Sequence, residues 1–213
     1  MTLSVGLLIG LIVPVLFTVL SLRTRNFYFN VGVTASCAVL VALSPAMMNA
    51  LPVLCFFVLS IVGDYFMGHQ GKDQRYYLFG IAGFFCAHGC LIWYSAARFA
   101  NAPWVIWAGV ALAVAYGLYL ALRILPNVLQ PAMVVAIGLY AAISLAALLT
   151  GAAQSVPMLQ RVLYALGVAM IVFSDTMICE VDFAHNSVPQ PAIMPTYFLC
   201  HILVAASILV SGL

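Results

Sequence analysis

The chain has 213 residues, of which 66% are hydrophobic and 6% are charged, and its mean hydropathy is +1.19. A soluble domain of this length cannot bury so much apolar surface, so the composition excludes a soluble protein and indicates an integral membrane protein. The net charge of +2 is small and the cations are scattered, which excludes a basic surface for nucleic acid.

Several apolar stretches are long enough to cross a bilayer, whose core of ~30 Å needs a helix of about 20 residues. Pro14 lies inside the first stretch and predicts a kink there. The sequence predicts an all-α polytopic protein, in which eight transmembrane helices form a single integral membrane domain over residues 1–213. The expected spans are 3–22, 27–45, 50–68, 76–97, 103–122, 129–150, 158–179 and 191–211.

Lysine and arginine set the expected orientation, because short cytoplasmic loops are enriched in these residues. Five cations fall on the side that follows the odd-numbered spans and two fall on the other side, which predicts that both termini lie outside. The five are Arg23, Arg25, Lys72, Arg75 and Arg123, and the two are Arg98 and Arg161. The minimal loops favour a bacterial inner membrane. The six cysteines lie in or beside apolar runs, which predicts buried thiols without a metal or a disulfide.

Two of the five acidic residues, Asp64 and Asp175, lie inside the third and seventh apolar stretches. A carboxylate in hydrocarbon costs roughly 2.5–3.5 kcal/mol on insertion scales, so such a residue marks a functional site by default. Both aspartates lie near the C-terminal end of an odd-numbered span, which puts them on the same side of the membrane, roughly 6 Å below the boundary. We therefore expect one shared site with two catalytic aspartates. The alternative is that each carboxylate only accepts a hydrogen bond from a neighbouring hydroxyl.

The two halves of the chain resemble each other around these aspartates. IVGDYFMG in the third span is similar to IVFSDTMI in the seventh, and the next spans carry His88 in FFCAHGC and His201 in YFLCHIL. Since four spans return the chain to its starting side, the pattern favours two four-helix units in a parallel 4+4 repeat.

Four further residues are expected to bind substrate inside the bundle. His88 and His201 should lie deeper than the carboxylates, by roughly 10 Å, at the floor of a cavity. Tyr197 stands one turn before His201 and faces the same way, and the Ser174 hydroxyl can bond Asp175 or a lipid. Each imidazole can equally be a packed residue bonded to a backbone carbonyl.

Two loops follow the aspartate-bearing spans. Lys72 and Arg75, after the third span, can bind a lipid phosphate, although plain positive-inside topology also explains them. Glu180, Asp182 and His185, after the seventh span, are expected to form a solvated acidic loop.

These residues together resemble the YhhN family of integral membrane proteins, the lysoplasmalogenases. The marks are the eight spans, GDYFMG in the third, the phenylalanine-rich fourth with His88, FSDTMI in the seventh, and a last span led by Tyr197. The resemblance implies hydrolysis of the vinyl-ether bond of a lysoplasmalogen, with a lysophospholipid as substrate, membrane lipids as neighbours and no cofactor or metal.

Vinyl-ether hydrolysis suits two aspartates in one desolvated site. The reaction needs a carboxylic acid that protonates the outer alkene carbon and a carboxylate that stays ionised, and like charges held close together cannot both ionise cheaply. The apolar neighbours of Asp64 favour it as the acid, and the hydroxyls beside Asp175 favour that residue as the carboxylate.

Three other interpretations stay open from the residues. The first is a metal-dependent lipid hydrolase with zinc between the two aspartates and the two histidines. The second is a proton-coupled transporter, in which the aspartates titrate during exchange. The third is a lipid-binding bundle without turnover.

Overall fold

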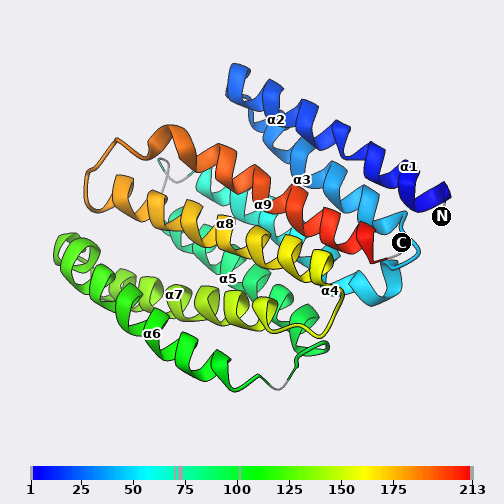
Figure 1. Ribbon diagram of the computed structural model, residues 1–213. Helices are drawn as coiled ribbons and strands as arrows, with labels where there is room; N and C mark the ends of the chain where they lie inside the picture. Colours follow the sequence, from blue (N-terminus) through cyan, green and yellow to red (C-terminus); the bar gives the residue numbers. More distant parts are fainter. Residues whose placement is uncertain (1, 70, 72–73, 101, 212–213) are drawn as a thin grey trace.

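The computed structural model describes residues 2–69, 71, 74–100 and 102–211, and within these ranges the chain is helical without a named strand. The membrane-crossing architecture predicted from composition is confirmed (Figure 1). The helices are α1 (Thr2–Gly10), α2 (Ile12–Thr24), α3 (Phe27–Ala42), α4 (Leu51–Met67), α5 (Gln74–Ala96), α6 (Trp104–Tyr119), α7 (Pro131–Ala152), α8 (Met158–Asp182) and α9 (Gln190–Val210).

Two helix pairs form the centre of the bundle. α8 packs along α9 and α4 along α5, and these are the most extensive helix contacts in the described chain. α2 and α3 cover one edge of this centre and α6 and α7 cover the other, so α6 lies at the periphery (Figure 1). The chain begins and ends at the same end of the bundle, as an even number of spans requires (Figure 1).

Each predicted span has a helical counterpart. Seven helical segments are long and apolar enough to cross a membrane. The second span is shorter, because α3 ends at Ala42 after 16 residues and a 3₁₀ turn, Met47–Ala50, leads into α4. At 1.5 Å per residue α3 is about 24 Å long, somewhat less than a typical hydrocarbon core.

The first span is broken, as Pro14 predicts. α1 ends at Gly10 and α2 begins at Ile12, so the break falls one turn before the proline. A proline ring clashes with the carbonyl of the residue four positions earlier, which here is Gly10, and proline supplies no N–H for that carbonyl. The physical cause of the kink is therefore local.

The seventh span is longer than predicted. α8 continues to Asp182, so Glu180 and Asp182 belong to the helix and the expectation of a loop at these two positions is wrong. Asp175 lies seven residues before the end of α8 (182 − 175), whereas Asp64 lies three residues before the end of α4 (67 − 64). These spacings correspond to about 10 Å and about 4.5 Å along the helix axes, so the equal depth expected from the sequence does not follow from the helix ends.

Glycines bring α4 and α5 together beside the first aspartate. A Cβ atom on Gly83 would lie 3.2 Å from the Cα of Gly63, and a Cβ on Gly63 would lie 3.0 Å from the ring of Phe84. Small residues allow this kind of close approach between membrane helices. The crossing fixes Phe84 against the backbone turn that carries Asp64.

Candidate active site

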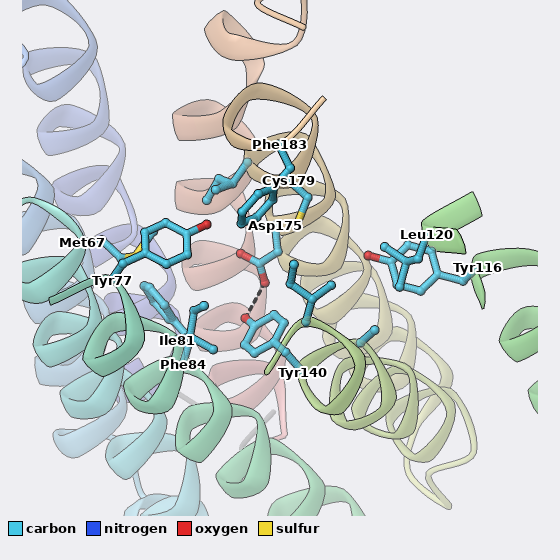
Figure 2. Close-up of a pocket in the computed structure, with 13 residues that line it drawn as sticks. Met67, Tyr77, Ile81, Phe84, Tyr116, Leu120, Tyr140, Asp175, Cys179 and Phe183 are labelled. Atoms are coloured by element: carbon cyan, nitrogen blue, oxygen red, sulfur yellow. Dashed lines mark hydrogen bonds between the residues drawn. The ribbon is translucent and has the colours of Figure 1, made fainter. Parts of the chain in front are cut away.

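A cavity opens between α5, α7 and α8 and reaches Asp175 (Figure 2). The space between its walls, including the open mouth, is about 580 Å³. The lining is largely aliphatic and aromatic, with few polar groups. The lining residues are Met67, Tyr77, Ile81, Phe84, Tyr116, Leu120, Ile137, Tyr140, Ala141, Asp175, Ile178, Cys179 and Phe183.

Asp175 is held in the cavity wall by a tyrosine of the neighbouring helix. The Tyr140 hydroxyl on α7 donates a hydrogen bond of 2.6 Å to Oδ2 of Asp175. The other carboxylate oxygen points into the cavity, toward the side where Met67 and Tyr77 lie (Figure 2). One oxygen of Asp175 is therefore engaged by the protein, and the second faces the space that a ligand would occupy.

Asp64 is not among the residues that line this cavity. Its carboxyl group neighbours the Tyr197 phenol on α9 and is within electrostatic range of Asp175. No hydrogen bond of good geometry is formed here, because Oδ2 of Asp64 and the Tyr197 hydroxyl are both buried without a partner. The Phe84 ring, which lines the cavity, meets the Tyr197 ring edge-on at 6.0 Å.

The two histidines have equivalent local geometry and different surroundings. Nδ1 of His88 lies 2.9 Å from the Phe84 carbonyl, and Nδ1 of His201 lies 2.9 Å from the Tyr197 carbonyl. Because a carbonyl only accepts, Nδ1 of each ring carries the proton. Both rings are fully buried, and Nε2 of each has no partner.

His88 belongs to the polar network of the cavity, and His201 does not. His88 meets Tyr140 edge-on at 5.1 Å, with Nδ1 3.4 Å from the hydroxyl that binds Asp175. His201 instead stacks on Phe56 at 5.3 Å and lies 5.8 Å from the ring of Phe57, outside the cavity lining. Neither histidine lines the cavity, so the floor expected from both is not formed, and His88 contacts the cavity wall only through Tyr140.

The hydroxyls beside Asp175 do not bind it. Ser174 is buried and donates to the Ile193 carbonyl at 3.0 Å. Thr176 donates to the Val172 carbonyl at 2.7 Å and shares a bond of 2.8 Å with the Tyr116 hydroxyl. The hydroxyl that binds Asp175 is therefore that of Tyr140. The sequence does not single out Tyr140, because one tyrosine in an apolar helix carries no local signal.

Of the two cations expected at a lipid phosphate, only Arg75 lies among the described residues. Lys72 lies outside the described residues, and Arg75 is exposed near the start of α5 and is absent from the cavity lining. The residues of the presumed acidic loop are instead tied to neighbouring helices. Tyr77 of α5 donates to Asp182 at 3.1 Å, and Tyr119 donates to Glu180 at 2.7 Å.

No group of three or more His, Cys, Asp or Glu side chains in the described ranges converges as metal ligands would. The four residues of the zinc interpretation are therefore not assembled around one point. The six cysteines are all unbridged thiols.

Comparison with known proteins gives one match. The model of the YhhN family matches residues 27–208, which is more than four fifths of the chain. No curated protein and no solved structure matches.

Proposed function

Because the chain belongs to the YhhN family, we propose that it is a lysoplasmalogenase, which hydrolyses the vinyl-ether bond of a single-chain ether lipid to a fatty aldehyde and a glycerophospho-base. One observation carries the proposal. Asp175 stands in the wall of an apolar cavity, with one oxygen bound by Tyr140 and the other directed into the cavity. The proposed site of action is a bacterial inner membrane, where the substrate is dissolved.

The first step is transfer of a proton to carbon. The outer alkene carbon takes the proton of Asp175 with the electron pair of the double bond, and the positive charge spreads over the inner carbon and the ether oxygen. Negative charge develops on Asp175 at the same time, and the Tyr140 hydrogen bond becomes stronger as it develops. A donor already in position stabilises this charge without reorganisation.

This geometry favours Asp175 as the acid, the reverse of the assignment that its sequence neighbours favour. The group that protonates substrate must reach it, and Asp175 lines the cavity while Asp64 does not. Asp64 acts instead as the second carboxyl of a coupled pair. Two carboxyls in one apolar site cannot both ionise cheaply, because like charges repel.

Water completes the reaction. Its oxygen bonds to the inner carbon of the oxocarbenium ion while its proton passes to a carboxylate. The resulting hemiacetal then breaks its bond to the glycerol oxygen, which takes up a proton from the carboxyl pair while the hemiacetal hydroxyl gives its proton back to the pair, and the aldehyde forms. One water is consumed, and the carboxyl pair returns to its starting protonation. Oxocarbenium-like states and paired carboxyls occur together in glycosidases for the same chemical reason.

The test is aldehyde release by purified protein given a single-chain vinyl-ether phospholipid. We expect turnover by the wild type and a loss of at least about 100-fold in Asp175→Asn, since asparagine keeps the shape of the carboxyl but cannot deliver the proton. A folded Asp175→Asn variant with wild-type turnover would remove this residue from the chemistry. Wild-type protein that moves protons or lipid but releases no aldehyde would favour the transporter. Aldehyde release lost on chelation would favour a metal-dependent hydrolase.

A further inference from the structure

Arg123 lies near the cavity and has N–H donors that its ion-pair partner does not occupy. It lies in the π-helical turn Leu120–Ile124 that continues α6, and its side chain is 54% exposed. Nε lies 3.2 Å from Oε1 of Glu180, and Nη2 lies 3.4 Å from Oε2. A strong charge-assisted pair is shorter, about 2.7–2.9 Å, and a guanidinium has five N–H donors. Arg123 is therefore loosely paired and able to bind a second anion.

Glu180 does not depend on Arg123 for its hydrogen bonds. It accepts one at 2.7 Å from the Tyr119 hydroxyl and one at 3.0 Å from the amide of Asn186, and its side chain is 13% exposed. If the guanidinium turned to another anion, the carboxylate would still have two donors. Arg123 can therefore bind another anion without leaving the Glu180 carboxylate unpaired.

The distance from Asp175 to the Arg123–Glu180 pair also matches the length of the substrate between its alkene and its phosphate. Leu120, one turn before Arg123, and Cys179, next to Glu180, both line the cavity (Figure 2). Glu180 is five residues beyond Asp175, which is about 7.5 Å along α8. In a single-chain vinyl-ether phospholipid six bonds separate the inner alkene carbon from phosphorus, which is about 7.5 Å at roughly 1.25 Å per bond. A substrate with its alkene at Asp175 can therefore place its phosphate at the level of Arg123.

We infer that Arg123 is the phosphate-binding residue of the site and that it takes the phosphodiester of a single-chain lipid while the chain occupies the cavity. Arginine suits this role because its planar fork binds phosphate oxygens in pairs. The inference rests on the proposed function for the identity of the chain linkage, but not for the phosphate. It assigns the headgroup contact to Arg123 rather than to Arg75 and gives Glu180 the role of a resting partner.

Binding provides a test that needs no turnover. The probes are 1-palmitoyl-lysophosphatidylcholine and 1-palmitoylglycerol, titrated against protein in lipid nanodiscs. The wild type should bind the phospholipid at least about 10-fold more tightly than the neutral lipid, and Arg123→Gln should lose most of that preference. Glu180→Gln should increase phospholipid affinity, because it removes the competing charge. The control is Arg23→Gln, which changes an exposed arginine at the same end of the bundle and should leave both affinities unchanged.

The opposite effects expected for Arg123→Gln and Glu180→Gln on phospholipid affinity distinguish a phosphate site from a purely structural ion pair. Loss of phospholipid preference in both Arg123→Gln and Glu180→Gln would mean that the pair only supports the fold, and would overturn the inference. A preference retained in Arg123→Gln, or lost equally in Arg23→Gln, would do the same. Displacement of the phospholipid by millimolar inorganic phosphate alone, without the chain, would assign the site to free phosphate instead.

Turnover then separates this inference from the proposed function. With the vinyl-ether phospholipid, Arg123→Gln should raise KM about 10-fold or more with little change in kcat, and with the matching alkenylglycerol, which lacks phosphate, it should have no effect. Phospholipid preference that depends on Arg123 in a protein without vinyl-ether turnover would refute the lysoplasmalogenase and keep the phosphate site. Vinyl-ether turnover by a protein whose phospholipid preference does not depend on Arg123 would support the lysoplasmalogenase and refute the phosphate site.

Discussion

Replacing Tyr140 by phenylalanine tests the reaction at its most specific contact. The change deletes one oxygen atom and with it the 2.6 Å hydrogen bond to Oδ2 of Asp175. The ring remains, so the edge-on contact with His88 at 5.1 Å and the shape of the cavity wall are retained. The substitution therefore changes the stabilisation of the developing carboxylate and little else.

The expected magnitude follows from the type of bond. A hydrogen bond to a charged group contributes about 1.5–3 kcal/mol. This bond is stronger in the transition state than in the ground state if Asp175 loses its proton in the slow step, and about 1.4 kcal/mol corresponds to a factor of ten. We expect Tyr140→Phe to lower kcat by about 10- to 100-fold, with KM within about threefold of wild type.

The assay is aldehyde release from a single-chain vinyl-ether lipid, measured with protein in nanodiscs. Tyr116→Phe is the matched control, because Tyr116 also lines the cavity but its hydroxyl bonds Thr176 at 2.8 Å rather than a carboxyl. The control should retain kcat within about threefold. Folding of both variants is checked by thermal melting of the purified protein.

Two results would refute the reasoning. A Tyr140→Phe variant with wild-type kcat would show that Asp175 does not develop charge in the slow step. Equal losses in Tyr140→Phe and Tyr116→Phe would show that hydroxyls in the cavity wall act through packing rather than through the carboxyl.

Three further expectations address the bundle and the reaction. Gly83→Ala should lower the free energy of unfolding by about 1–3 kcal/mol, because its Cβ would lie 3.2 Å from the Cα of Gly63. The control is Gly89→Ala on the same helix, whose Cβ meets nothing within 4 Å and which should leave the melting temperature equal or higher. Equal melting temperatures of the two variants would contradict the close crossing. His201→Gln should keep kcat within about threefold in the aldehyde assay, since the ring packs on Phe56 outside the cavity, and a large loss of kcat would return His201 to the site. The rate should fall in deuterium oxide, as proton transfer to carbon requires, and ester-linked lysolipids should be poor substrates; equal hydrolysis of ester and vinyl ether would argue for a general lipid hydrolase.

The fold follows from the sequence more completely than the site does. Hydropathy locates the spans, and Pro14 predicts the break that separates α1 from α2, because both effects act within one or two helical turns. The end of α8 is missed, since Glu180 and Asp182 look like loop residues until Tyr119 and Tyr77 are found beside them. These partners come from helices 61 and 105 residues away in the chain, beyond the reach of local patterns.

The same limit applies to the catalytic groups. The sequence singles out Asp64 and Asp175 because a carboxylate in hydrocarbon is costly. It cannot show that Asp64 is absent from the cavity lining, or that Tyr140 rather than Ser174 binds Asp175. Helical periodicity indicates a face, but the neighbour on that face is decided by packing.

The peripheral position of α6 affects how the protein will behave outside its bilayer. Within Trp104–Tyr119 no residue is fully buried, and the helix packs on α7 while reaching α8 through the side chains of Tyr116 and Tyr119. A segment with so little buried surface belongs to the least stable cooperative units of a fold, so its amides should exchange hydrogen earliest. In detergent, lipid acyl chains no longer hold α6 against the bundle, so the part of the cavity wall next to α6 becomes more mobile. Micelles and nanodiscs should therefore give different chain-length preferences for the same polypeptide.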